Sequence, residues 1–187
     1  WRTAAFDAVR RWYTELGVPV YVGADRTGGR WPNRSAMRND AAAQALAAGH
    51  DLLLFADADT FVPADQMWAA AHLAADRGRF TLAFNTYARV SRTATERWRG
   101  KVRAIDRRTD RAMRPGAYTS TLHAACAHGV PADLWHAVGG YDQRFVRWGF
   151  EDRAFWLACM VIGGGVEWVD GTAWHWWHPT AGDKDRR

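Results

Sequence analysis

Apolar positions along the chain alternate between a helical spacing and unbroken β-rich runs. Apolar residues recur at three- and four-residue steps between Phe6 and Leu16, which indicates an amphipathic helix that ends at Gly17. The unbroken apolar run in DLLLFADAD, residues 51–59, is typical of a fully buried strand. In order, the first half is predicted to contain that helix, a β-rich run at 18–25, a loop at 27–35, an alanine-rich helix at 36–49, the strand at 51–59, a helix from Pro63 to about Gly78 and a strand at 80–90.

The second half shows the same kinds of pattern at less regular spacing. It is predicted to contain one or two strands within 118–130, a helix at 131–140, a helix at 151–165, and a strand, turn and final strand over 166–179. Alternating helices and strands favour a single α/β domain over 1–187, with a mostly parallel central sheet flanked by helices. Ligands of such sheets bind beyond the carboxyl ends of the strands. Asp25 and the segment 57–59 both follow predicted strands at such ends.

Composition and charge add limits on the partners. The chain has 187 residues, twelve of them tryptophan, and a formal net charge of +5. A positive excess suits anionic ligands such as nucleotides, phosphates, nucleic acid or membrane surfaces, although it also serves solubility. Much of it lies between Arg89 and Arg114, where few large apolar residues occur. Cys126 and Cys159 lie in apolar stretches and are predicted to be buried free thiols. No apolar run is long enough to span a bilayer, and no signal peptide is visible, so we expect a cytoplasmic protein.

Two aspartates end the predicted strand at 51–59. Asp57 and Asp59 are two positions apart and would project to one side of the strand end. There they could share one divalent cation, or divide between a cation and a ribose. A purely structural interpretation is a turn aspartate followed by a helix cap, because Pro63 begins the next helix. For an isolated Asp-X-Asp pattern, that interpretation is the more common one.

A second acidic motif favours a functional interpretation of Asp57 and Asp59 over the purely structural one. Residues 138–159, VGGYDQRFVRWGFEDRAFWLAC, place a glycine turn, an aromatic residue and an aspartate before Trp148-Gly149 and the pair Glu151-Asp152. The order of the motifs, with a late histidine in HWWHP (175–179), resembles the GT-A nucleotide-sugar glycosyltransferases over about residues 18–179. The similarity is to family-2-like enzymes with a galactosyltransferase-type carboxyl half.

The resemblance implies a Rossmann-like GT-A fold. It further implies a nucleotide-sugar-binding half at 18–100 and an acceptor and catalytic half at 115–179. Domains of this family begin with a strand before the first helix. Because the numbered chain starts directly in a predicted helix, we expect that first strand to be missing from it.

The same resemblance assigns roles to the acidic residues. It implies that Asp57 and Asp59 bind Mn²⁺ or Mg²⁺ and, through the ion, the donor diphosphate. Asp152 would be the general base that deprotonates the acceptor hydroxyl, with Glu151 positioning a substrate. Trp148 would form a wall on which a sugar stacks.

The final metal ligand would come from HWWHP. The resemblance favours His178, with His175 second. Successive strand side chains point to opposite faces, so one straight strand could not offer both to a single ion, but a turn before Pro179 would allow it. Either histidine could instead pack as an ordinary core residue among the neighbouring tryptophans.

Three further residues have weaker assignments. Asp25 resembles the acidic residue that contacts the base or ribose, although an ordinary turn aspartate fits equally well. Arg38 and Asn39 resemble a pair that precedes the DxD strand and touches the phosphate or sugar of the donor. The alternative for Arg38 is a surface position on a helix.

The sequence therefore predicts a metal-dependent enzyme that moves a sugar from a nucleotide-diphosphate sugar, a UDP-sugar being favoured, to an acceptor hydroxyl with inversion. The acceptor would be a glycan, a protein or another hydroxyl compound. One alternative is a nucleotidyltransferase-like metal enzyme, but TGGR (27–30) is too short to indicate a phosphate loop. Another is a noncatalytic basic module that binds sugar or nucleic acid, which would leave the DxD and WGxED motifs unexplained.

Overall fold

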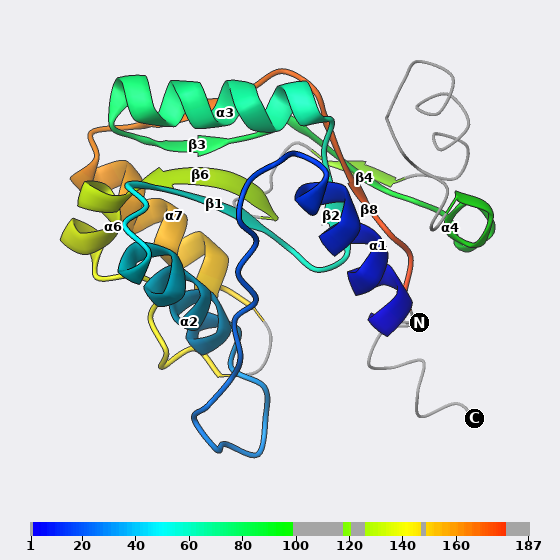
Figure 1. Ribbon diagram of the computed structural model, residues 1–187, viewed down its shortest axis with the longest axis horizontal. Coiled ribbons are helices and arrows are strands. Elements are labelled where there is room, and N and C mark those ends of the chain that lie inside the picture. The colour runs from blue at the N-terminus through cyan, green and yellow to red at the C-terminus, as the bar shows by residue number, and fades with distance from the viewer. Residues whose placement is uncertain (1, 99–117, 121–125, 147–148, 179–187) are drawn as a thin grey trace.

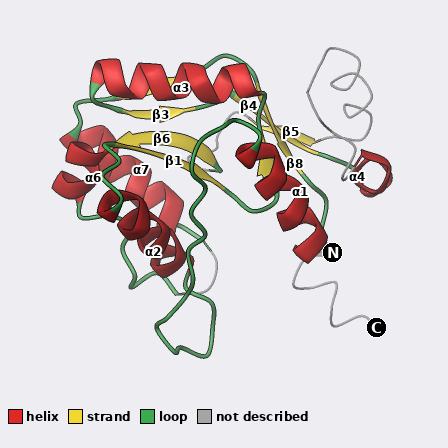
Figure 2. Cartoon of the chain, viewed as in Figure 1, coloured by secondary structure: helices red, strands yellow, loops and turns green. Residues whose placement is uncertain are grey.

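The computed structural model describes residues 2–98, 118–120, 126–146 and 149–178, which form a mixed α/β structure (Figures 1 and 2). Its helices are α1 (Arg2–Thr14), α2 (Arg34–Ala47), α3 (Ala64–Arg77), α4 (Arg92–Trp98), α6 (Ala132–Val138) and α7 (Glu151–Ile162). Its strands are β1 (Leu52–Ala56), β2 (Thr60–Phe61), β3 (Phe80–Leu82), β4 (Thr86–Arg89), β5 (Tyr118–Ser120), β6 (Ala127–Pro131), β7 (Val166–Trp168) and β8 (Thr172–His175).

These strands form two four-stranded sheets, in the orders β1-β6-β3-β7 and β2-β8-β4-β5. In the first sheet, β6 is antiparallel to both β1 and β3, whereas β3 and β7 are parallel. In the second, β4 and β8 are parallel, while β2 and β5 are antiparallel to their neighbours. The prediction of a mostly parallel sheet is therefore wrong. The strands β1, β3 and β7 do share one direction, but β6 arrives from the second half of the chain and inserts between two of them in the opposite sense.

Three connections carry the chain from the first sheet to the second: residues 57–59 between β1 and β2, 83–85 between β3 and β4, and 169–171 between β7 and β8. Two of them are tied together, because the amide of Asn85 donates to the carbonyl oxygen of Gly171 at 3.2 Å and the amide of Gly171 donates to Asn85 Oδ1 at 3.1 Å. The third contains both aspartates of the DxD motif. The predicted strand at 80–90 is accordingly two strands, one in each sheet.

Helices cover both faces of the first sheet (Figure 1). Helix α3 packs on one face against β3 and β6, and α2, α6 and α7 lie on the other. The predicted ends of α3 are confirmed: Pro63 precedes it and Gly78 follows in the left-handed conformation, with φ of 64°. Pro131 and Gly139 bound α6 in the same way.

An aromatic core fills the space between the first sheet and helices α6 and α7. The buried imidazole of His128 stacks between Phe55 and Phe80, with ring centroids 5.0 and 4.7 Å away. Tyr141 stacks on Phe155 of α7 with centroids 4.0 Å apart. This packing fixes the start of α7 against the end of β1, where the sequence places its acidic motifs.

The predicted β-rich run at 18–25 forms no strand. It lies in extended form along α2, and side chains of that helix satisfy its backbone: the amide of Ala24 donates to Asp40 Oδ2 at 2.9 Å. Gly23 approaches α2 so closely that an added Cβ would lie 1.7 Å from the carbonyl oxygen of Met37. The amide of Ala24 is thus satisfied by a helix side chain and not by a neighbouring strand.

Other predictions can be compared directly. Cys126 and Cys159 are buried free thiols, as predicted. Within the described ranges, every helix is too short or too polar to cross a bilayer. Most of the basic segment between Arg89 and Arg114 lies outside the described residues.

Candidate active site

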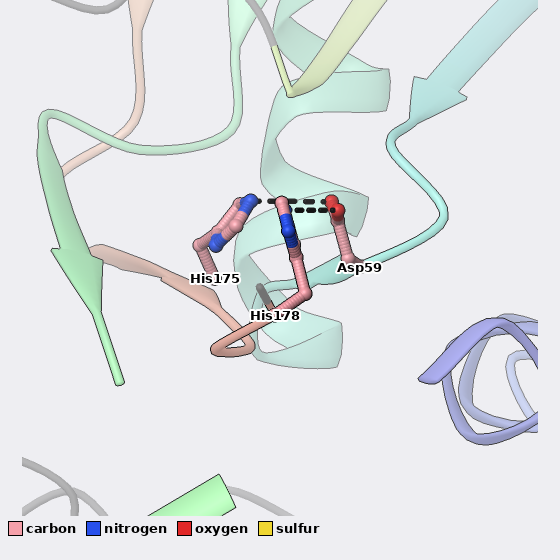
Figure 3. Close-up of side chains that lie close together, drawn as sticks. All are labelled: Asp59, His175 and His178. Atoms are coloured by element: carbon pink, nitrogen blue, oxygen red, sulfur yellow. Dashed lines mark ion pairs between the residues drawn. The ribbon is translucent and has the colours of Figure 1, made fainter. Parts of the chain in front are cut away.

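One acidic and two imidazole side chains meet where β1 passes into β2 (Figure 3). Asp59 Oδ1 lies 3.4 Å from His175 Nε2, and Asp59 Oδ2 lies 3.3 Å from His178 Nε2. One ligand atom from each of the three residues lies within 4.8 Å of the others. His175 is the last residue of β8 and pairs with Thr60 of β2, and the chain leaves the strand before His178. Both histidines can therefore reach the same carboxylate.

The backbone holds this group in place from both sides. The amide of Trp176 donates to the carbonyl oxygen of Asp59 at 2.8 Å, which extends the β2–β8 pairing to the aspartate itself. Burial opposes ionisation of Asp59, but hydrogen bonds and charge interactions with His175 and His178 outweigh it and lower its pKa well below the usual value. Asp59 is thus kept as a carboxylate.

The donor set fits a divalent transition metal. A carboxylate oxygen and two imidazole nitrogens are ligands that Mn²⁺, Fe²⁺ and Zn²⁺ accept, whereas Mg²⁺ prefers oxygen donors alone. Asp57, the other aspartate of the DxD motif, does not belong to this group among the described residues. The two aspartates predicted to share one ion thus have different neighbours.

Asp57 belongs instead to a second charged group, centred on Arg38 of α2. Arg38 Nη2 donates to Asp57 Oδ1 at 2.7 Å, and Arg38 Nη1 donates to Asp152 Oδ1 in the first turn of α7. Glu151 Oε1 lies 3.9 Å from Arg38 Nη1 and 3.5 Å from Arg34 Nη1. Glu151 is buried, and its Oε2 accepts a hydrogen bond from the amide of Gly149 at 3.1 Å.

Within the Arg38 group, the pKa of Asp152 is raised above its usual value. Burial raises its pKa, Arg38 opposes the rise, and the charges of Asp57 and Glu151 add to it, so that the pKa reaches about 6. A carboxyl group with a pKa near neutrality can both hold and release a proton under physiological conditions, as a general base requires.

The two charged groups face a common neighbour, Cys126. Burial raises the pKa of the Cys126 thiol, and the negative charges of Asp57, Asp152 and Asp59 raise it further. The carbonyl oxygen of Cys126 accepts a hydrogen bond from the amide of Asp57 at 2.8 Å. The three aspartates thus converge on one region, at the junction of the two sheets.

Two residues that the sequence did not single out complete the surroundings of Arg38. The guanidinium carbon of Arg38 lies 4.9 Å from the ring centroid of Tyr141, and Tyr141 Oη lies 3.1 Å from His128 Nε2. Asn39 clamps the backbone of Tyr141 in both directions: Nδ2 donates to the carbonyl oxygen at 2.8 Å, and Oδ1 accepts from the amide at 2.9 Å. The only sequence signal that pointed to Tyr141 was its place in the GGYDQRF motif.

The remaining predicted site residues have other settings. Asp25 accepts hydrogen bonds from the Thr27 hydroxyl and from the amides of Asn33 and Thr27, which lower its pKa. This network shapes the loop before α2, as the turn alternative predicted. Trp148 lies outside the described residues.

The comparisons with known proteins leave the family open. No protein-family model matches the chain, and no curated protein matches it either.

Proposed function

We propose that this protein is a metal-dependent glycosyltransferase that moves a sugar from a nucleotide-diphosphate sugar to an acceptor hydroxyl. The observation that carries the proposal is that the DxD segment contributes to two groups: Asp59 meets His175 and His178 in a metal-type donor set, and Asp57 shares Arg38 with Asp152, a carboxyl group of near-neutral pKa. The GT-A-like order of the motifs in the sequence gives this pairing its chemical interpretation. A UDP-sugar is the favoured donor.

The donor would be held at the junction between the sheets. Asp59, His175 and His178 would hold a divalent cation, Mn²⁺ fitting the nitrogen ligands better than Mg²⁺. When bound, such an ion supplies positive charge against the departing diphosphate. Protein side chains would carry out the proton transfer and position the reacting groups.

Asp152 would accept the proton of the acceptor hydroxyl. Its Oδ1 is engaged by Arg38, and no described residue donates a hydrogen bond to its Oδ2, which leaves that oxygen for the proton. In the transfer, the acceptor oxygen forms a bond to the anomeric carbon, the bond from that carbon to the diphosphate oxygen breaks, and Asp152 takes the proton. Attack opposite the leaving group gives inversion. Buried Glu151, held by Arg34 and the Gly149 amide, would fix the start of α7 beneath Asp152.

The test is a panel of UDP-, GDP- and TDP-sugars, assayed for nucleotide diphosphate release with Mn²⁺ and with EDTA. Release that requires Mn²⁺ and is lost in Asp59→Ala and Asp152→Asn would support the proposal and name the donor. Asp76→Asn, an exposed carboxylate on α3, is the matched control and should keep full activity. Release that survives EDTA or both site variants would overturn the proposal, as would no release with any donor.

A further inference from the structure

The Arg38 side chain is mostly buried and already paired with carboxylates, unlike an arginine that is open to a substrate phosphate. Its side chain is only 13% exposed, whereas that of its neighbour Arg34 is 44% exposed. Its two terminal nitrogens are each used by a different carboxylate, Asp57 after β1 and Asp152 on α7. Two of its five N–H donors are thus used by carboxylates, and burial leaves little of the guanidinium open to a donor phosphate.

The charge balance shows why the carboxylates need this cation. Asp57, Asp152 and Glu151 bring three acidic groups together, and the only cations that the structure pairs with them in the described ranges are Arg38 and the half-exposed Arg34. Removing one partner of a buried ion pair leaves an uncompensated charge. The pKa of Arg38 is raised: burial opposes its charge, but the interactions with Tyr141, Asp57 and Asp152 outweigh burial.

Arg38 is itself held in place by contact with Tyr141. The ring of Tyr141 faces the guanidinium, its hydroxyl is bonded to His128, and its backbone is clamped by Asn39, the residue next to Arg38. Tyr141 also stacks on Phe155, three residues beyond Asp152 on α7. One connected set of contacts thus links α2, the end of β1 and the start of α7 through the Arg38 side chain.

We propose that Arg38, seated on Tyr141, is a positioning residue that orients the carboxylate of Asp152 and holds Asp57 beside it. Arg38 does not act by binding the donor. The proposal rests on the proposed function for its kinetic consequence, but its structural part can be tested without any turnover. Lysine is the informative replacement, because its single ammonium keeps the charge but cannot reproduce a planar guanidinium that spans two carboxylates.

The kinetic test compares Arg38→Lys with Arg77→Lys, an exposed control on α3. A misplaced catalytic group costs on the order of 100-fold, so kcat should fall about 10- to 100-fold in Arg38→Lys while KM for the donor stays within about twofold. The control should match the wild type. A rise in the donor KM with kcat unchanged would show that Arg38 binds the donor and would overturn the proposal.

A second pair of variants tests the support from Tyr141. Tyr141→Phe keeps the ring beneath Arg38 and should keep kcat within about threefold, whereas Tyr141→Leu removes the ring and should lose about tenfold, in line with the range of cation–π energies. Equal kcat values for the two folded variants would contradict a role for the ring.

The third measurement needs no activity. Carbon-13 NMR of the aspartate side chains, with Asp152→Asn used for assignment, follows the titration of Asp152 in the wild type and in Arg38→Lys. The charged groups that face Asp152 are Arg38 and Arg34 from α2, Asp57 after β1 and Glu151 on its own helix. If Arg38 controls this carboxylate, its midpoint should rise by about half a pH unit or more in the variant. An unmoved midpoint would overturn the proposal even in an active enzyme, and a moved midpoint in a protein that uses no sugar donor would fault only the proposed function.

Discussion

Replacing Asp152 by asparagine should stabilise the protein at alkaline pH while it abolishes transfer. The side chain of Asp152 is 28% exposed and lies beside Asp57 and Glu151, so its negative charge is unfavourable in the folded state even with Arg38 beside it. Asparagine has nearly the same shape and no charge to bury. A group that serves catalysis at a cost in stability is typical of enzyme active sites.

The magnitude follows from the pKa. Folding raises the pKa of Asp152 from 3.8 to about 6, and each pH unit of that rise corresponds to about 1.4 kcal/mol. Because the folded-state pKa is the higher one, the stability contributed by this group is fully present below about pH 3.8 and is lost as the pH rises through about 6. The loss at pH 8 is about 3 kcal/mol, and about half of it has occurred by pH 5.

Urea denaturation of the wild type, Asp152→Asn and the control Asp76→Asn at several values between pH 5 and pH 8.5 measures this directly. We expect Asp152→Asn to gain about 2 to 3 kcal/mol over the wild type at pH 8 and about half as much at pH 5. The control should show no pH-dependent gain. A variant that is less stable than the wild type at pH 8 would mean that the Arg38–Asp152 pair outweighs the cost of burial, and the assignment of Asp152 as a base of near-neutral pKa would fall.

Two other predictions concern the metal group and the packing beside it. His175→Ala and His178→Ala should each weaken Mn²⁺ binding by at least about 100-fold in calorimetric titration, since even changes around a ligand cost 10- to 100-fold. The exposed His136→Ala is the control, and unchanged affinity in either ligand variant would remove that histidine from the site. Gly23→Ala should lower the free energy of unfolding by about 2 kcal/mol or more, because its Cβ would meet the Met37 carbonyl oxygen, and an unchanged urea midpoint would contradict this close packing.

The helices of the first sheet could be predicted because local chemistry decides where they begin and end. Pro63 and Gly78 bound α3, and Pro131 and Gly139 bound α6, each by its own backbone preference and without help from distant residues. The apolar run that became β1 was equally clear. These signals extend over a few residues, which is the range that a single sequence exposes.

Strand pairing could not be predicted in the same way. Nothing in the local sequence at 127–131 shows that β6 will insert antiparallel between β1 and β3, because direction and neighbours depend on the path of the chain in between. The run 18–25 has a suitable composition for a strand, but α2 packs against it and satisfies its backbone instead. In both cases tertiary contacts outweighed the local β preference.

The side chains of the site also show which features local sequence can predict and which depend on tertiary contacts. The sequence could mark Asp57 and Asp59 as candidates, and their spacing allowed either one shared cation or a division between a cation and a ribose. The partner of each aspartate is decided by residues distant in the sequence: Asp57 pairs with Arg38, which also pairs with Asp152, and Asp59 meets His175 at the end of β8 and His178 beyond it. Two carboxylates one residue apart can thus serve separate tasks, because the chain turns from one sheet to the other between them. The DxD segment thus places Asp59 against the two histidines and Asp57 against Arg38, which joins it to Asp152.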